Sequence, residues 1–426
     1  MNISEKTRAA AAEAEQALAP LFAEIDETAR RGTERVLDVF REEHVSESMF
    51  APSTGYGYGD VGRDAIDRIA AKVFGAEAGF MRPSILSGTH ALTIGLFGLL
   101  RPGDVMLSIT GSPYDTLREV IGMDGKTGAG SLADFGVEYD EVPLVPGALF
   151  DWDGIAAALR RHGCRVKVVF LQRSKGYLDR PTLRVGEIAE AIRFVRGVAG
   201  EAPFIVVDNC YGEFTEEREP CAVGADLIIG SLIKNPGGGM ADIGGYLCGT
   251  ARAVELAGNR LCCPGVGLDA GASLGQNRNM LRGLFYAPHT VAQAIKTAHL
   301  AAWLFEKAGF GVNPGPFVRR SDIIQTVALG DAARLCRFCE GIQMASPVDA
   351  HVTPVPSPMP GYADDVIMAA GAFVGGASIE LSADAPLRAP YTVFLQGGLT
   401  YESGRLGIMQ AYDYVMAAGG TDPGEK

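Results

Sequence analysis

The sequence predicts an α/β protein with a large domain built on a mainly parallel sheet and a smaller α+β domain at the C-terminus. From residue 63 the chain alternates between short apolar runs and helical patterns, which is typical of strands joined by helical crossovers. Several apolar runs have no polar face, which indicates strands covered by helices on both sides. At 426 residues the chain is long enough for two such domains.

Residues 1–50 are expected to form a helical arm, with alanine- and charge-rich helices at 5–22 and 25–40. Residues 51–285 are expected to form the large domain, with a sheet of the seven-stranded type. Its predicted strands are 78–82, 104–109, 137–142, 166–171, 204–207, 227–229 and 244–248. Its predicted helices are 63–74, 88–100, 151–161 and 185–196.

Residues 286–426 are expected to form the small domain. A long helical region at 273–307, interrupted near Pro288, leads into it. The strand candidates that follow are 323–329, 366–370, 377–381 and 391–395, and the helix candidates are 331–340 and 401–416. The mixture of isolated strands and helices predicts an α+β domain.

The composition excludes several classes of protein. A net charge of −13 argues against binding nucleic acid, and no apolar run is long enough to predict a membrane span. The first 19 residues lack the basic and apolar regions of a secretion signal. Eight cysteines without a disulfide spacing fit a cytoplasmic protein, and Cys336 and Cys339 lack the second pair that a structural metal site needs.

Lys234 follows the apolar run 226–230 and precedes three consecutive glycines, Gly237 to Gly239. Burial at the end of a strand disfavours a lysine charge, and glycines allow a ligand to approach the backbone closely. The pattern fits a lysine that forms a Schiff base with a carbonyl cofactor. It also fits a surface lysine in a flexible turn.

Asp208 follows four apolar residues, so it is expected at the carboxyl end of a buried strand, where α/β sheets bind ligands. A carboxylate that holds a pyridine nitrogen and a lysine that holds an aldehyde are the two protein groups that pyridoxal phosphate requires. Asp208 and Lys234 would supply them. Alternatively, Asp208 is an ordinary helix N-cap.

Polar residues at other strand ends extend this site. Ser87, Gly88 and Thr89 open a predicted helix, whose N-terminus could bind a phosphate or simply be capped by a hydroxyl. Tyr114 could stack on a flat cofactor ring or lie in an open turn. Gln172 could donate a hydrogen bond to a cofactor substituent.

Taken together, these motifs resemble those of fold-type-I pyridoxal-phosphate enzymes, and most closely the methionine γ-lyase-like proteins often labelled aluminium resistance proteins. The resemblance spans most of the chain, and its specificity comes from the set of motifs. The motifs are Ser87–Ala91, Gln172–Tyr177, Val207–Phe214, Ser231–Gly239 and Gln396–Tyr401.

The resemblance implies pyridoxal 5'-phosphate as the cofactor and a role for each matching residue. Lys234 would hold the cofactor aldehyde and move protons, and Asp208 would hold its ring nitrogen. The remaining cofactor-binding residues would be Ser87, Gly88, Thr89, Tyr114, Gln172, Ser231, Tyr56 and Arg63. Tyr56, Tyr58 and Arg63 would reach the site of a neighbouring subunit, in a homotetramer built as a dimer of dimers.

The expected activity is γ-elimination on a γ-substituted L-amino acid, with a thiolate leaving group or with a halide that leaves an alkyne product. Tyr114 or Tyr58 would assist the leaving group, and Arg388 would bind the substrate carboxylate unless it is only a surface charge. The alternatives are a β-eliminating carbon–sulfur lyase, an aminotransferase, and a cofactor-binding resistance or regulatory protein. Asp242 and Ile243 depart from the family pattern near the lysine loop.

Overall fold

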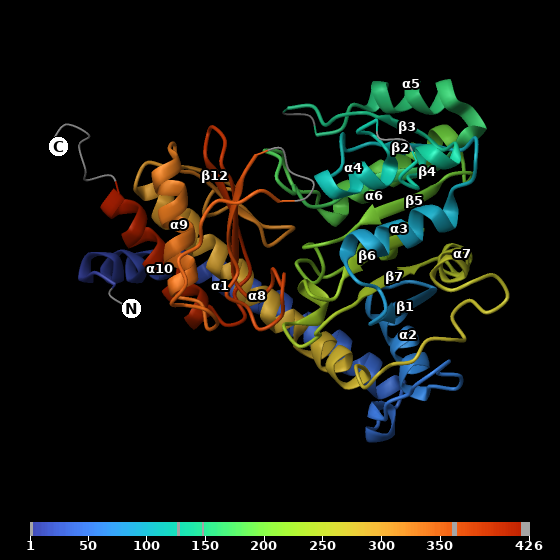
Figure 1. Ribbon diagram of the computed structural model, residues 1–426, viewed down its shortest axis with the longest axis horizontal. Helices are drawn as coiled ribbons and strands as arrows, with labels where there is room; N and C mark the ends of the chain where they lie inside the picture. The colour runs from blue at the N-terminus through green and yellow to red at the C-terminus, as the bar shows by residue number, and fades with distance from the viewer. Residues whose placement is uncertain (1–2, 126–127, 147–148, 360–363, 419–426) are drawn as a thin grey trace.

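The computed structural model describes residues 3–125, 128–146, 149–359 and 364–418, which form two lobes joined by long helices (Figure 1). Within these residues, the large lobe contains a seven-stranded sheet in the order β1-β7-β6-β5-β4-β2-β3. Only β7 runs antiparallel to its neighbours β1 and β6. The predicted α/β fold with a mainly parallel sheet is therefore confirmed.

The strands of this sheet lie close to the predicted apolar runs. They are β1 (Ala78–Arg82), β2 (Val105–Ser108), β3 (Glu138–Glu141), β4 (Val166–Gln172), β5 (Phe204–Asp208), β6 (Leu227–Ser231) and β7 (Gly245–Gly249). The helices of this lobe are α2 (Val61–Val73), α3 (Gly88–Leu99), α4 (Asp115–Ile121), α5 (Trp152–His162), α6 (Val185–Ala199) and α7 (Ala251–Leu261).

Helices cover both faces of the sheet, which explains why its strands have no polar face. On β5, Val206 packs with residues of α3, α4 and α7, whereas Ile205 and Val207 pack with residues of α2, α5 and α6. Alternate side chains of a strand point to opposite faces, so each face has its own apolar core.

The small lobe contains a five-stranded antiparallel sheet in the described part of the chain, ordered β10-β11-β12-β9-β8. Its strands are β8 (Gly311–Asn313), β9 (Gln325–Ala328), β10 (Val366–Ala369), β11 (Ser382–Pro386) and β12 (Thr392–Gln396). Helices α9 (Ala332–Met344) and α10 (Tyr401–Ala418) complete the lobe. The strand predicted at 377–381 is wrong, because the chain enters the sheet only at Ser382.

Two long helices connect the lobes. Helix α1 (Glu5–Glu42) and helix α8 (Asn277–Lys307) pack along each other and run from one lobe to the other (Figure 1). The first half of α1 contributes Leu18 to the core of the small lobe, and its second half contributes Val36 and Val39 to the core of the large lobe. The helical arm is therefore part of both cores.

The predicted break between helices 5–22 and 25–40 and the predicted interruption near Pro288 are both wrong. Helix α1 continues through Pro20, which is exposed, so water can solvate the carbonyl that loses its helical partner. Helix α8 continues through Pro288, which is buried against α1. A Cβ at Gly32 would lie 3.0 Å from the Pro288 Cβ, so a glycine at this crossing makes room for the proline ring.

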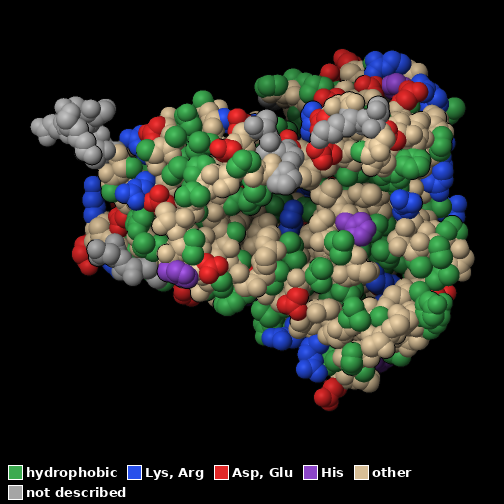
Figure 2. Space-filling model, viewed as in Figure 1, with side chains coloured by type: hydrophobic (Ala, Val, Ile, Leu, Met, Phe, Trp, Pro, Cys, Tyr) green, Lys and Arg blue, Asp and Glu red, His purple; other side chains and the backbone are tan. Residues whose placement is uncertain are grey.

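Charged side chains of both signs lie on the surface. Figure 2 shows acidic and basic side chains interspersed over the face that it presents. Among the described residues, no helix is long and apolar enough to cross a membrane.

Candidate active site

The carboxyl ends of three adjacent strands place polar side chains at one edge of the large sheet. Gln172 ends β4, Asp208 ends β5 and Ser231 ends β6, and all three are buried. Gln172 and Asp208 are directly paired in the parallel ladder. Parallel strands end at the same edge, so the fold gathers residues that are far apart in the sequence.

Asp208 and Lys234 lie within electrostatic reach of each other at this edge. Burial raises the pKa of Asp208, and the positive charge of Lys234 opposes that rise. Burial also disfavours the charge of Lys234, but the acidic groups of Cys210, Tyr211 and Asp208 outweigh burial and hold the pKa of Lys234 well above its usual value. A hydrogen bond from the Cys210 backbone N–H (3.1 Å) fixes the Asp208 carboxylate.

The N-terminus of α3 faces Ser231. A Cβ at Gly88 would lie 3.5 Å from the Ser231 Cβ, and the buried Ser231 hydroxyl has no hydrogen-bond partner within the described residues. Ser87 caps α3 by accepting a hydrogen bond from the His90 N–H (3.1 Å), as the simpler interpretation expected. Free N–H groups and an unused hydroxyl together form a site suited to a phosphate.

Tyr114 links this phosphate site to the strand ends. Its hydroxyl lies 2.9 Å from the Thr89 hydroxyl, and its backbone N–H donates to the Gln172 Oε1 at 2.9 Å. Burial raises the pKa of the Tyr114 phenol, with the Asp208 charge adding to the effect. Tyr114, Thr89 and Gln172 are therefore brought together as the sequence predicted, although their contacts with a cofactor remain a prediction.

The residues at this edge fit pyridoxal phosphate. The unpaired Ser231 hydroxyl and the α3 N-terminus suit a phosphate. Asp208 is a buried carboxylate within electrostatic reach of the Lys234 amine. Such a carboxylate suits a protonated ring nitrogen. Lys234, on the adjacent strand connection, suits the aldehyde.

The residues predicted to reach a neighbouring subunit lie on the loop before α2 and in the first turn of α2. Tyr56 and Tyr58 are 75% and 64% exposed, and their rings stack with centroids 5.4 Å apart. Arg63 is buried and donates to the carbonyl oxygens of Gly57 (2.8 Å) and Gly271 (3.0 Å). Arg63 thus holds the loop that carries Tyr56 and Tyr58 against its own chain. A direct contact between Arg63 and a cofactor remains a prediction.

Arg388 lies on the connection between β11 and β12, where it is exposed and pairs with Asp364 at 3.3 Å. Burial raises the pKa of Asp115, and Arg388 is the largest of the charges that oppose this rise. Arg388 therefore acts electrostatically on the start of α4, next to Tyr114. Asp242, at the position that departs from the family pattern, accepts a hydrogen bond from the Asn279 side chain (2.8 Å).

The sequence reasoning missed Tyr211 as a site residue. The Lys234 Nζ lies 3.9 Å from the centroid of the Tyr211 ring, and the Tyr211 hydroxyl lies 3.3 Å from the Ser378 hydroxyl of the small lobe. Tyr211 has a φ of 71°, a backbone conformation that is strained for a large side chain. Its position three residues after Asp208 was the available signal.

Asp384 is a second missed residue, on β11 of the small lobe. Its Oδ2 accepts hydrogen bonds from the Tyr177 hydroxyl (2.7 Å) and the Gln396 side chain (2.9 Å), whereas its buried Oδ1 has no partner in the described structure. Burial raises the pKa of Asp384, and Lys234 is among the groups that oppose the rise. No strand-end pattern in the large sheet could reveal it, because it comes from the other lobe.

A family model for methionine gamma-lyase matches residues 7–416. The chain belongs to this family. The match runs through both lobes and includes every candidate residue named above, so the predicted resemblance is confirmed.

The sequence similarity to relatives extends over almost the whole chain. An uncharacterized protein of Bacillus subtilis, YnbB, is 52% identical over 412 residues, which is 97% of each chain. A Listeria monocytogenes protein, proposed to be a cystathionine beta-lyase involved in aluminum resistance, has a solved structure that is 47% identical with a TM-score of 0.93, covering 96% of this chain and 100% of that one.

A more distant structure shares the fold alone. The pyridoxal-5'-phosphate-dependent protein YhfS from Escherichia coli is 16% identical, with a TM-score of 0.61 over 92% of this chain and 97% of that one. The fold is thus that of fold-type-I pyridoxal-phosphate enzymes. Family membership, this fold and the fit of the site support pyridoxal phosphate as the cofactor and a carbon–sulfur lyase as the class of enzyme.

Proposed function

We propose that the protein is a pyridoxal-phosphate-dependent carbon–heteroatom lyase that catalyses γ-elimination on a γ-substituted L-amino acid. The observation that carries the proposal is the buried Asp208 held opposite Lys234, beside the unpaired Ser231 hydroxyl. Pyridoxal phosphate, when bound, supplies an electron sink for the negative charge that develops on the substrate.

Lys234 is the proposed proton carrier. Lys234 would take the proton from the substrate α-carbon, return it to the bound cofactor and substrate, and, neutral again, take one from the β-carbon, so that the bond to the γ-substituent can break. The Tyr211 ring, 3.9 Å from the Lys234 Nζ, supports the lysine in its protonated form through a cation–π contact. Asp208 would hold the ring nitrogen of the cofactor in its protonated form.

The γ-substituent leaves with the electrons of its bond. A thiolate needs a proton, which Tyr114 or Tyr58 would supply, and a halide leaves as the free anion. With a saturated thioether substrate, the remaining carbon chain loses its amine and yields ammonia and a 2-oxo acid. With an unsaturated halogenated substrate, the amine is retained and the side chain becomes an alkyne.

Arg388 is the proposed ligand of the substrate α-carboxylate. A guanidinium can bind a carboxylate through two parallel hydrogen bonds. Support comes from its electrostatic effect on Asp115, beside Tyr114, and from its weak present pairing with Asp364 at 3.3 Å. Tyr56 and Tyr58 would complete the site of a neighbouring subunit in a homotetramer.

A second candidate is β-elimination from cysteine-like substrates, which the proposed activity of the Listeria monocytogenes relative favours. The same Lys234 and Asp208 would serve, but only the α-proton would be removed before the leaving group departs. The two reactions differ in the carbon that carries the leaving group, so they are separable by substrate.

The test is a panel of γ-thio, γ-halo and β-substituted amino acids, followed by assays of ammonia and by mass spectrometry of the products. Turnover of the γ-substituted members supports the proposal, whereas turnover of the β-substituted members alone supports the second candidate. Transfer of the amine to an added 2-oxo acid would indicate an aminotransferase. No turnover of any member would refute a lyase.

The lysine assignment has its own test. Reduction of the holoenzyme with borohydride should attach the cofactor to the peptide that contains Lys234, and Lys234→Ala should lose this adduct together with activity. Lys175→Met is a matched control, because Lys175 is also buried and burial lowers the pKa of its amine to about 8. Cofactor found on Lys175 instead would overturn the assignment.

A further inference from the structure

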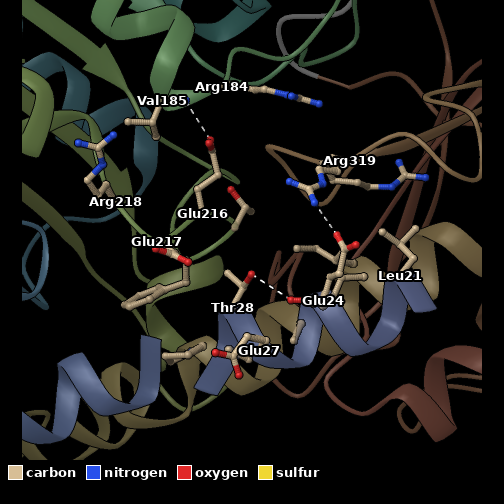
Figure 3. Close-up of a pocket in the computed structure, with 18 of the residues that line it drawn as sticks. Leu21, Glu24, Glu27, Thr28, Arg184, Val185, Glu216, Glu217, Arg218 and Arg319 are labelled. Atoms are coloured by element: carbon tan, nitrogen blue, oxygen red, sulfur yellow. Dashed lines mark hydrogen bonds and ion pairs between the residues drawn. The ribbon is translucent and has the colours of Figure 1, made fainter. Parts of the chain in front are cut away.

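The cavity between α1, α8 and the loop after β5, about 700 Å³ in volume, does not form a charged ligand site (Figure 3). Its described lining holds four glutamates and four arginines, so the charges balance. Figure 3 shows Arg184 and Arg218 pointing apart. Reactive groups that do converge lie at the C-terminal end of α7.

Two adjacent cysteines, Cys262 and Cys263, follow directly on α7. Both are exposed, and their sulfur atoms lie 3.9 Å apart. The hydrogen bond with Cys262 raises the pKa of the Cys263 thiol, so the two sulfurs interact as one unit. The other described cysteines are buried or partly buried except Cys164, which is exposed but has no cysteine next to it in the sequence.

The two thiols are poorly placed for a disulfide with each other. The peptide bond between them is trans. A trans peptide sets adjacent Cα atoms about 3.8 Å apart, whereas disulfides usually join Cα atoms about 4.4–6.8 Å apart. A disulfide between them would be strained and readily reduced, so we expect the pair to persist as free thiols.

Their spacing instead suits two bonds to one thiophilic atom. Two thiolates bound tetrahedrally at the Zn–S distance of about 2.3 Å lie about 3.8 Å apart, close to the separation of these sulfurs. Gly265 and Gly267 follow the pair with φ of 90° and 54°, and such residues let the chain adjust around a bound group.

The surroundings of the pair decide which thiophilic ligand fits. Among the described residues, no three or more His, Cys, Asp or Glu side chains are grouped to hold a metal ion. A structural zinc ion requires four protein ligands, so two thiols do not suffice for it. A ligand that needs only two sulfurs from the protein and carries its own third substituent is satisfied here.

We propose that Cys262 and Cys263 form a dithiol site that chelates a monosubstituted trivalent arsenical. Each thiol loses its proton and forms one S–As bond, the arsenic–oxygen bond breaks, and the oxygen leaves with both protons as water. Arsenic stays trivalent, so the step needs no oxidant or reductant. The site concerns these two thiols alone and does not rest on the proposed lyase reaction.

The test is titration of the holoenzyme with phenylarsine oxide, followed by mass spectrometry of the intact subunit and of its peptides. One phenylarsenic group per subunit is expected, on the peptide that contains Cys262 and Cys263. Two linked ligands exceed a single one by about 100-fold or more, so Cys262→Ser and Cys263→Ser should each weaken binding by about that factor. Cys164→Ser is the matched control, an exposed single thiol, and should bind like the native protein.

Chelation also predicts how the bound group is released. A small dithiol should remove it, whereas the same thiol concentration of a monothiol should not. Removal by the monothiol would show attachment to one sulfur and overturn the proposal. No uptake, unchanged affinity in both Cys262→Ser and Cys263→Ser, or a subunit that lacks two hydrogens at this peptide before titration, which indicates a disulfide, would overturn it as well.

Discussion

At Asp208, burial and a neighbouring cation act in opposite directions on one carboxylate. Burial favours the neutral acid, and Lys234 favours the charged form. Asp208→Asn keeps the shape but cannot hold a proton on the ring nitrogen of the cofactor, so we expect kcat/KM to fall by about 100-fold or more. Steady-state kinetics of Asp208→Asn and Asp208→Glu check this, and the charge-conserving glutamate should recover part of the loss.

Glu213 predicts how stability depends on pH. Burial raises its pKa to about 8 from 4.5, and its Oε1 accepts a hydrogen bond from the Tyr246 hydroxyl at 2.8 Å. Between those two values the folded protein binds a proton that the unfolded chain has lost, so this group makes the free energy of unfolding fall as pH rises.

Glu213→Gln should therefore lessen the decline in stability between pH 5 and about 8. Denaturant unfolding of the apoprotein at several pH values measures it, with Glu255→Gln on the exposed surface of α7 as the control. If the free energy of unfolding of Glu213→Gln falls with pH as steeply as that of the native protein, Glu213 is not the cause of the decline.

Site residues were predictable where they directly follow the apolar run of a strand. Lys234, Asp208 and Ser231 each follow an apolar run, and parallel strands bring such positions together. Asp384 was not predictable in this way, because its partner Tyr177 comes from the other lobe. Tyr211 had only its position three residues after Asp208 as a signal, because residue type does not predict its left-handed backbone conformation (φ 71°).

At the scale of elements, α1 depends on tertiary packing more than on its own sequence. Leu18 is fully buried in the small-lobe core, whereas Leu37, on the same helix, is 42% exposed. Leu18→Ala should lower the free energy of unfolding by about 3 kcal/mol because it leaves a cavity. Denaturant unfolding should show a much smaller effect for Leu37→Ala, and equal effects would contradict this packing.

The same packing explains which element boundaries the sequence predicted. Strands of the large sheet followed from apolar runs, since burial on both faces leaves a continuous signal. A gap between residues 22 and 25 and an interruption near Pro288 were instead predicted, but α1 and α8 are continuous because their packing outweighs the lost hydrogen bonds. Residues 377–381 contain a strand-like pattern but precede β11, because local preference does not fix sheet register.

At the scale of the whole molecule, the lobes meet beside the site through the loop after β4. Lys175 donates to the Asn313 carbonyl (3.1 Å), Ser174 donates to Asp322 (3.2 Å), and the Tyr177 ring packs on Phe394 with centroids 4.9 Å apart. The same loop begins at Gln172, which binds the Tyr114 backbone. A change in how the lobes pack would therefore reach the residues around Lys234.

The proposed sharing of sites between subunits predicts complementation between two inactive variants. If Tyr58 serves the neighbouring site, Lys234→Ala and Tyr58→Ala are each impaired, but a hybrid dimer has one site with both residues intact. Random mixing of subunits should then restore about one quarter of native activity, because half the dimers are hybrids with one competent site in two. The measurement is activity after the two variants are unfolded and refolded together, with each variant refolded alone as the control. Activity no greater than the average of the two separate variants would show that Tyr58 acts in its own chain, as the contacts of Arg63 with Gly57 would also permit.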